Sequence, residues 1–227
     1  DAGQKVCNAG SITRGSITPE LIVTMIKVLM VVPIIIGLYL SATITWYYIP
    51  AGFLCILISF LYSGGPKPIS RTPFGEISSG IAMGFAIVLI TGYAWTRDLS
   101  LALLIPAIPS TLLVGSIMLT NNIRDIPTDR ESGKMTAAVR LGDRASRWVF
   151  AACAWVPVGM IVALGVALGM HPLATCALGV GTAAPAVGVS LPVLTGASGR
   201  ALIVVLRNTG FFTLAWAILA GLALVLS

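Results

Sequence analysis

The stretch from Pro19 to Ser41 reads PELIVTMIKVLMVVPIIIGLYLS and contains a single acidic and a single basic residue. An α-helix needs about 20 mostly apolar residues to cross the hydrocarbon core of a bilayer. This stretch is long enough, and a helix satisfies all of its backbone polar groups internally, as a membrane requires. It therefore predicts a transmembrane helix.

Six more runs of the same kind follow along the chain. The sequence is 57% hydrophobic and 10% charged, with a mean hydropathy of +0.97. These values exclude an ordinary soluble domain, which is about 45–50% apolar and about 25% charged, and also a disordered chain. The predicted fold class is all-α, a multi-pass transmembrane helix bundle. Its seven helices are expected at roughly 19–41, 43–63, 75–96, 99–120, 147–169, 172–195 and 202–226.

The basic residues separate sharply between the two ends of these spans. One side has only Arg97, whereas the other holds the N-terminal segment and the loops near 64–74, 121–146 and 196–201. Because cytoplasmic loops retain Lys and Arg, we predict that this second side faces the cytoplasm. The expected localisation is a cell membrane, with the C-terminus outside.

Two basic residues, Lys27 and Arg207, fall within predicted spans. Each is close enough to a cytoplasmic end for its side chain to snorkel to the interface. The alternative is that both face a cavity and meet an anionic substrate group, since charges inside a membrane are often functional. The sequence leaves both interpretations open.

Half of the eight acidic residues, Asp125, Asp129, Glu131 and Asp143, fall in one predicted loop. Asp125 and Asp129 are four positions apart, so on a helix both carboxylates would point the same way. Paired carboxylates suit Mg²⁺, which keeps several waters and commonly bridges to substrate phosphates. We predict that this pair is catalytic and holds Mg²⁺.

Basic residues surround the two aspartates. Arg124, Arg130 and Lys134 are expected to bind the remaining phosphate oxygens, with Arg giving bidentate contacts and Lys a point charge. In the competing interpretation Asp125 is only a helix N-cap, with Pro127 in the first turn and a solvated, mixed-charge loop around it. Asn121 and Asn122 favour the metal site, because a polar pair at the end of an apolar span is costly unless used or solvated.

A second polar loop, residues 62–76, reads YSGGPKPISRTPFGE. Its Gly and Pro residues fix turns, so it is either a plain connector or part of a site. In the second case Tyr62, Lys67 and Arg71 would close over a polar substrate head.

Three stretches together resemble a known family. NNIRDIPTDRESGK at 121–134, with VRLG at 139–142, resembles the second aspartate motif of the UbiA superfamily of intramembrane prenyltransferases. LYSGGPKPISRTPFGE at 61–76 resembles the Tyr-Thr-Gly-Gly-Pro loop of its 1,4-dihydroxy-2-naphthoate branch, which serves menaquinone synthesis. GSITRGSITP at 10–19 resembles the segment after the family's first aspartate motif.

The resemblance implies nine helices, with the first aspartate motif after helix two and the second after helix six. The predicted spans place Asp125 and Asp129 after the fourth, so two helices and the first motif are expected to precede this sequence. No N-D-x-x-D-x-x-x-D pattern occurs, unless Asp1 is its last residue. Residues 1–18 are then expected to be a cytoplasmic loop remnant, and 19–227 the transmembrane prenyltransferase domain.

The resemblance also implies a reaction, the Mg²⁺-dependent transfer of a polyprenyl group from a polyprenyl diphosphate to 1,4-dihydroxy-2-naphthoate. The product would be demethylmenaquinone, with loss of the acceptor's carboxylate. Asn121, Asn122 and Lys134 would support the diphosphate, while Tyr62, Lys67 and Arg71 would lie near the acceptor or the diphosphate. The expected partners are these substrates and the lipid bilayer, and no nucleic acid.

Rival functions remain at this stage. Another aromatic acceptor of the same superfamily, such as 4-hydroxybenzoate, homogentisate or haem, is disfavoured only softly by the Tyr-Ser-Gly-Gly-Pro loop. A CDP-alcohol phosphotransferase is disfavoured because its D-G-x-x-A-R pattern is absent. A transporter would place polar residues and broken helices at mid-membrane, whereas here the charged residues gather at one face.

Overall fold

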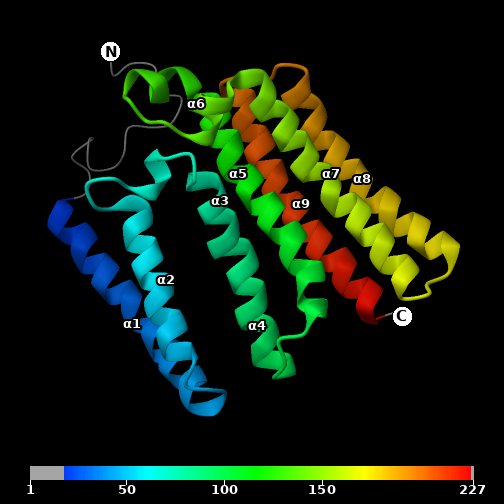
Figure 1. Ribbon diagram of the computed structural model, residues 1–227, viewed down its shortest axis with the longest axis horizontal. Coiled ribbons are helices and arrows are strands. Elements are labelled where there is room, and N and C mark those ends of the chain that lie inside the picture. Colours follow the sequence, from blue (N-terminus) through cyan, green and yellow to red (C-terminus); the bar gives the residue numbers. More distant parts are fainter. Residues whose placement is uncertain (1–17, 226–227) are drawn as a thin grey trace. The chain divides into compact units, whose positions relative to one another are not determined.

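The computed structural model describes residues 18–225, and these residues form helices and turns with no strand among them (Figure 1). The predicted loop remnant at 1–18 lies outside the described residues except for Thr18, as does most of the 10–19 motif. Thr18 precedes helix α1 (Pro19–Thr43), and its hydroxyl oxygen accepts a hydrogen bond of 3.3 Å from the Leu21 amide. This N-cap satisfies one of the free amides of the first turn.

Within residues 18–225, six helical stretches are long and apolar enough to cross a membrane, so the all-α, multi-pass bundle is confirmed. The predicted span at 43–63 is the exception, because residues 44–47 leave the helix and α2 (Tyr48–Ser63) has only 16 residues. At 1.5 Å per residue it spans about 24 Å, less than a hydrocarbon core of about 30 Å. The six are Glu20–Thr43, Gly75–Thr96, Leu101–Arg124, Asp143–Ala167, Pro172–Leu194 and Arg200–Val225.

The chain forms two compact units, Asp1–Ser59 and Phe60–Ser227. In the first unit, α1 and the greater part of α2 run in opposite directions (Figure 1). The rings of Trp46 and Tyr47 lie 4.4 Å apart in the turn between them and are largely exposed. Exposed aromatic residues at the end of apolar helices fit an interfacial belt.

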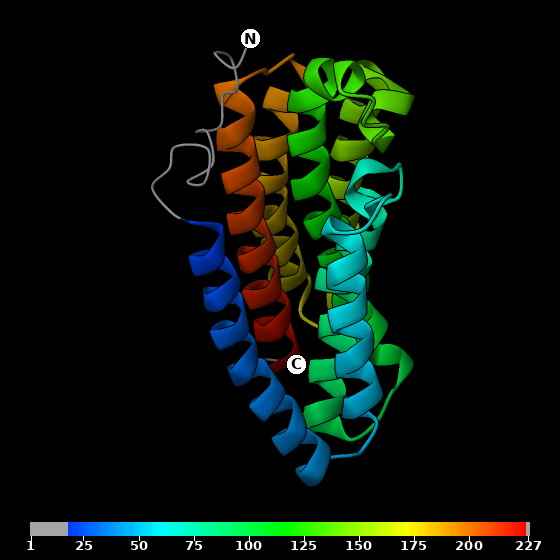
Figure 2. The same cartoon turned by 90° about the vertical axis from the view of Figure 1, so that its left-hand side faces the viewer.

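The second unit holds the packed core. Helices α5 (Leu104–Glu131), α7 (Asp143–Ala167), α8 (Pro172–Leu194) and α9 (Arg200–Val225) lie side by side in both views (Figures 1 and 2). Trp216, Phe150 and Phe212 are the largest side chains buried between them. The indole nitrogen of Trp216 on α9 donates a 3.0 Å hydrogen bond to the Pro157 carbonyl oxygen on α7, as a buried indole requires.

Buried hydroxyl groups in this core are satisfied within their own helices. Thr120, Thr182 and Thr209 are each 0–1% exposed, and each donates to the carbonyl oxygen four residues earlier at 2.7–2.9 Å. Such local bonds remove the cost of an unpaired polar group in an apolar interior. These residues therefore do not form a polar path through the middle of the unit.

Arg147 ties α7 to the end of α8. Its Nη1 donates to the carbonyl oxygens of Val193 (2.7 Å) and Ala197 (3.0 Å), and its Nε donates to Asp143 Oδ2 (2.8 Å). The last carbonyls of a helix have no partner within it. Arg147 donates to one such group, the Val193 carbonyl, and to the Ala197 carbonyl in the turn between α8 and α9.

The predicted loop at 121–146 is largely helical, which corrects the sequence interpretation. Helix α5 continues to Glu131, α6 (Ala137–Leu141) follows, and α7 begins at Asp143. Asp125 therefore lies inside α5 and is not a helix N-cap. The charges and Pro127 indicated a loop, but ion pairs of Asp125 with Arg124 and of Asp129 with Lys134 hold the polar end of α5.

Glycines set the distance between α5 and the rod that precedes it. This rod consists of α3 (Gly75–Gly80), the π-helical segment η2 (Ile81–Ala86) and α4 (Ile87–Thr96). A β-carbon on Gly80 would lie 2.7 Å from the Thr111 carbonyl oxygen, and one on Gly84 would lie 2.6 Å from Thr111 Cα. Only glycine allows the two backbones to approach this closely.

We expect Gly84→Ala to destabilise the protein by about 1–3 kcal/mol, because the new methyl group forces the two backbones apart. The measurement is thermal denaturation in detergent. The matched control is Gly188→Ala on α8, where a β-carbon would have nothing within 4 Å and where alanine favours the helix by about 0.8–1 kcal/mol. Equal melting temperatures for Gly84→Ala and the wild type would contradict the close-contact interpretation.

Candidate functional site

The candidate site begins at the polar end of α5. Asn122 and Asp129 are seven positions apart, so they lie on one face of the helix two turns from each other. Asn122 is 4% exposed and Asp129 is 8% exposed. Buried polar groups of this kind need partners, and the chain supplies them from two segments outside α5.

The first partner is Lys134, in the turn after α5. Its Nζ donates to Asp129 Oδ2 at 2.8 Å and to Asn122 Oδ1 at 3.4 Å. The backbone amide of Lys134 also donates to the Asp129 carbonyl oxygen at 2.8 Å. This turn depends on Gly133, whose φ of +69° falls in the left-handed region that favours glycine. The chain thus folds back over the end of α5 and brings a positive charge to a buried carboxylate.

The second partner is Glu76, which the sequence prediction missed. It is the second residue of α3, is 6% exposed, and accepts a 2.8 Å hydrogen bond through Oε1 from Asn122 Nδ2. Glu76 therefore completes a line of side chains that runs from α3 through Asn122 and Lys134 to Asp129. The only sequence signal for it was its place at the end of the motif at 61–76.

The two predicted metal ligands have different surroundings. Asp125 forms a bidentate pair with the neighbouring Arg124, with both nitrogen-to-oxygen distances at 2.8 Å. The Asp125 side chain is 36% exposed, whereas that of Asp129 is 11% exposed. The structure therefore pairs each aspartate with its own basic residue, and only Asp129 joins the buried line.

The two polar loops meet at Arg71. Its Nη2 donates to the Ser132 carbonyl oxygen at 3.2 Å, and its own carbonyl oxygen accepts from the Met135 amide at 3.1 Å. Tyr62 lies at the end of α2 in the same unit, with its hydroxyl buried and without a hydrogen-bond partner. Lys67, Arg71 and Arg130 are exposed, and Asn121 is half-buried. Arg207 is also exposed on α9, where it contacts Asn208.

The side-chain oxygens at the polar end of α5 are of the kind that bind a divalent cation. Two oxygens of α5, from Asn122 and Asp129, already converge on the ammonium of Lys134. Among residues 18–225, no three or more His, Cys, Asp or Glu side chains come close enough to hold a metal by themselves. Mg²⁺ keeps several waters and needs only one or two carboxylates together with substrate phosphates, so this sparse set of hard oxygen ligands suits it.

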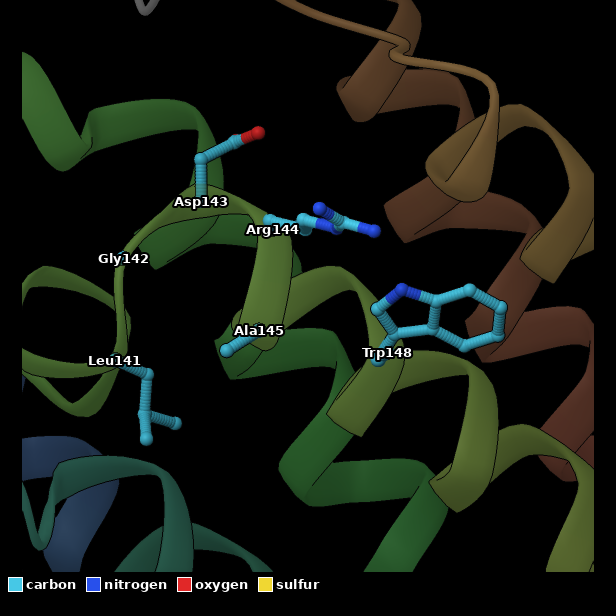
Figure 3. Close-up of a pocket in the computed structure, with 6 residues that line it drawn as sticks. All are labelled: Leu141, Gly142, Asp143, Arg144, Ala145 and Trp148. Carbon is cyan, nitrogen blue, oxygen red and sulfur yellow. The ribbon is translucent and has the colours of Figure 1, made fainter.

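A separate pocket of about 480 Å³ lies where α6 meets α7 (Figure 3). Arg144 and Trp148 extend from the first turns of α7, while Asp143 and Leu141 point in opposite directions. None of the predicted site residues lines it. We therefore place the candidate site in the buried line of side chains.

Comparison with known proteins gives a consistent family assignment. The profile of the UbiA prenyltransferase family matches residues 9–192. The 1,4-dihydroxy-2-naphthoate octaprenyltransferase of Bacillus subtilis is 35% identical over 71% of this chain, and the match covers 53% of that protein. The protein of the same name from Mycobacterium tuberculosis is 34% identical over 91% of this chain and is covered over 69%. This chain thus spans about half to two thirds of the length of these relatives.

A more distant relative is the mouse UbiA prenyltransferase domain-containing protein 1, which is 32% identical over 44% of this chain and is covered over 29% of its own length. No solved structure gives a significant match.

Removing the ammonium from the buried line should destabilise the fold. We expect Lys134→Met to lower the free energy of unfolding by about 1–3 kcal/mol, because the Asp129 carboxylate is left buried without its charged partner. Thermal denaturation in detergent measures this, with Arg140→Met, at an exposed residue of nearby α6, as the control.

Adding Asp129→Asn to Lys134→Met should recover part of the loss, because the uncompensated charge is then removed. Strictly additive losses in this double-mutant cycle would contradict a direct interaction between the two side chains.

Proposed function

Because the chain belongs to the UbiA prenyltransferase family, we propose that it transfers a polyprenyl group from a polyprenyl diphosphate to 1,4-dihydroxy-2-naphthoate within a cell membrane. The direct product would be the quinol form of demethylmenaquinone, formed as the diphosphate leaves the donor and the acceptor's carboxylate leaves as CO₂. The names of the bacterial relatives support the choice of acceptor. The observation that carries the proposal is the buried line from Glu76 to Asp129, which joins the two polar motifs at one end of an apolar bundle.

In this proposal, the polar end of α5 binds the diphosphate. Asp125 and Asp129 would hold Mg²⁺, which when bound supplies positive charge that stabilises the departing diphosphate. Lys134, Arg124 and Arg130 would contact the remaining phosphate oxygens, with Asn121 and Asn122 as hydrogen-bond donors. Lys134 then exchanges its contact with Asp129 for one with the diphosphate, so one ammonium serves both states of the site.

The rest of the molecule provides the apolar surroundings that the reaction needs. Polyprenyl tails are hydrocarbons, and the six long helices are apolar over lengths that match a bilayer. Helices that exclude water protect an allylic cation from hydrolysis. An electron-rich aromatic ring held near Tyr62, Lys67 and Arg71 would then attack the prenyl carbon in preference to water.

The direct test incubates membranes that contain the full-length protein with labelled polyprenyl diphosphate and 1,4-dihydroxy-2-naphthoate, in the presence of Mg²⁺ or EDTA. We expect a lipid-soluble, decarboxylated product that forms only with Mg²⁺. Product with 4-hydroxybenzoate, homogentisate or haem instead would correct the acceptor. Substrate movement across proteoliposomes without any covalent product would overturn the prenyltransferase proposal in favour of transport.

The metal ligands can be tested one at a time. Asp125→Asn and Asp129→Asn should each reduce Mg²⁺-dependent transfer by about 100-fold or more, because a weakened metal site would stabilise the leaving diphosphate less well. Glu131→Gln is the matched control, since this exposed carboxylate lies on the same helix. Full turnover in both aspartate variants would remove the metal-ligand assignment.

The proposed orientation has its own test. In a cysteine-free background, Glu131→Cys should react with a membrane-impermeant thiol reagent only in inside-out vesicles, and Leu99→Cys only in right-side-out vesicles. Both positions are exposed, and the first lies among the basic loops that the positive-inside rule assigns to the cytoplasm. The opposite labelling pattern would reverse the topology.

A further inference from the structure

One buried acidic residue, Glu76, is not assigned a contact with either substrate in the proposed function. Glu76 begins the rod of α3, η2 and α4, and it is 6% exposed. The glycine contacts at Gly80 and Gly84 hold this rod against α5. Glu76 is therefore fixed next to Asn122 by backbone packing, and its position does not depend on a mobile loop.

The two carboxylate oxygens of Glu76 have different surroundings. Oε1 accepts the 2.8 Å hydrogen bond from Asn122 Nδ2, which turns the amide oxygen of Asn122 towards Lys134. Oε2 is buried and has no hydrogen-bond partner. In the part of the chain that the structure describes, the only other buried side-chain oxygen or nitrogen without a partner is the Tyr62 hydroxyl. Burial raises the pKa of the Tyr62 hydroxyl, and the negative charge of the Glu76 carboxylate raises it further.

A buried carboxylate oxygen without a partner indicates a missing hydrogen-bond donor. Such an atom costs about 1–3 kcal/mol, so it is rarely kept without use. An ionised carboxylate can only accept hydrogen bonds, whereas a tyrosine hydroxyl can donate or accept. The group that satisfies Oε2 must therefore carry an O–H or N–H.

Only one of the two proposed substrates meets this requirement. The oxygens of an ionised diphosphate are acceptors and carry negative charge, so Glu76 would repel them. An aromatic diol carries hydroxyl donors on a flat apolar ring. We propose that Glu76 is a substrate-binding residue whose Oε2 accepts a hydrogen bond from a hydroxyl group of the aromatic acceptor, with Tyr62 beside that hydroxyl. This inference rests on the proposed function and adds a residue to it.

The position of Glu76 also gives it a role during the reaction. As the ring attacks the prenyl carbon, it gains positive charge, which its hydroxyl oxygen shares. A hydrogen bond from that hydroxyl to a buried carboxylate strengthens as the charge develops. In this proposal the two oxygens of Glu76 serve different substrates. Oε2 would bind the hydroxyl group of the ring, while Oε1 holds Asn122, a residue that would bind the diphosphate.

The test uses Glu76→Gln in the full-length protein. The glutamine oxygen can still accept from Asn122, while its NH₂ group replaces Oε2, so the missing acceptor is the main change. We expect the Kd of 1,4-dihydroxy-2-naphthoate, measured by equilibrium binding without donor or metal, to rise about 10-fold, which corresponds to about 1.4 kcal/mol. The KM of the polyprenyl diphosphate should change less than twofold. Glu131→Gln is the control and should change neither.

Analogues that each lack one hydroxyl complete the cycle. Only the analogue that lacks the hydroxyl bound by Glu76, either 1-hydroxy-2-naphthoate or 4-hydroxy-2-naphthoate, should bind the wild type about 10-fold more weakly than the diol. Glu76→Gln should bind that analogue with little further loss of affinity, because the same hydrogen bond is already missing. Tyr62→Phe, a second variant that retains the ring, should also weaken binding of the diol.

Several results would overturn the Glu76 proposal. These are an unchanged Kd in folded Glu76→Gln, equal losses for both substrates, additive losses with both analogues, or no binding of the diol to the wild type. Failure of transfer would be a separate result. If the wild type binds the diol through Glu76 but forms no prenylated product, the proposed reaction fails while the binding residue is retained.

Discussion

A carboxylate that is almost fully buried must have a compensating charge nearby, and this constraint on Asp129 organises the candidate site. The partner is Lys134, five residues further along the chain, so the backbone has to reverse direction immediately after α5. That reversal brings the turn after α5 to Arg71. The Arg71 side chain donates to the carbonyl oxygen of Ser132, and the amide of Met135 donates to the Arg71 carbonyl oxygen. Two motifs that are some 60 positions apart in sequence thereby meet through the hydrogen bonds of Arg71.

A second constraint comes from the apolar part of the molecule. Gly80 and Gly84 allow the backbone of the rod to touch that of α5 at Thr111. The rod is therefore held at a distance from which the short glutamate side chain of Glu76 reaches Asn122. Packing that involves no functional group thus determines which polar residues face each other. A wider helix spacing would break the buried line even with all of its side chains intact.

Much of the fold could be predicted from the sequence, because a bilayer allows few backbone structures and requires long apolar runs. The helix ends were harder to predict. The α2 prediction began too early, since Thr45, Trp46 and Tyr47 are apolar enough to extend a hydropathy run but form a turn. The predicted loop after residue 120 is mostly helix, because side-chain pairs stabilise the charged end of α5 beyond its apolar part.

The site was predictable only where spacing along one helix carries information. Asn122, Asp125 and Asp129 share a region of α5, as their spacing indicates, and Lys134 lies close by in the chain. Glu76 gave no such signal, since its contact with Asn122 joins residues 46 positions apart. The sequence also could not show that Asp125 would bond to its neighbour Arg124, because both rotamers and the local exposure decide that pairing.

The π-helical segment from Ile81 to Ala86 affects how the length of this chain can vary. A π-turn encloses one more residue than an α-turn. Loss of one residue there can therefore convert the segment to an α-helix, while α3 and α4 keep the same faces towards their neighbours. Loss of a residue elsewhere in the rod would rotate everything beyond it by about 100°. During evolution, this segment is therefore the position at which the rod can lose a residue without turning Glu76 away from α5.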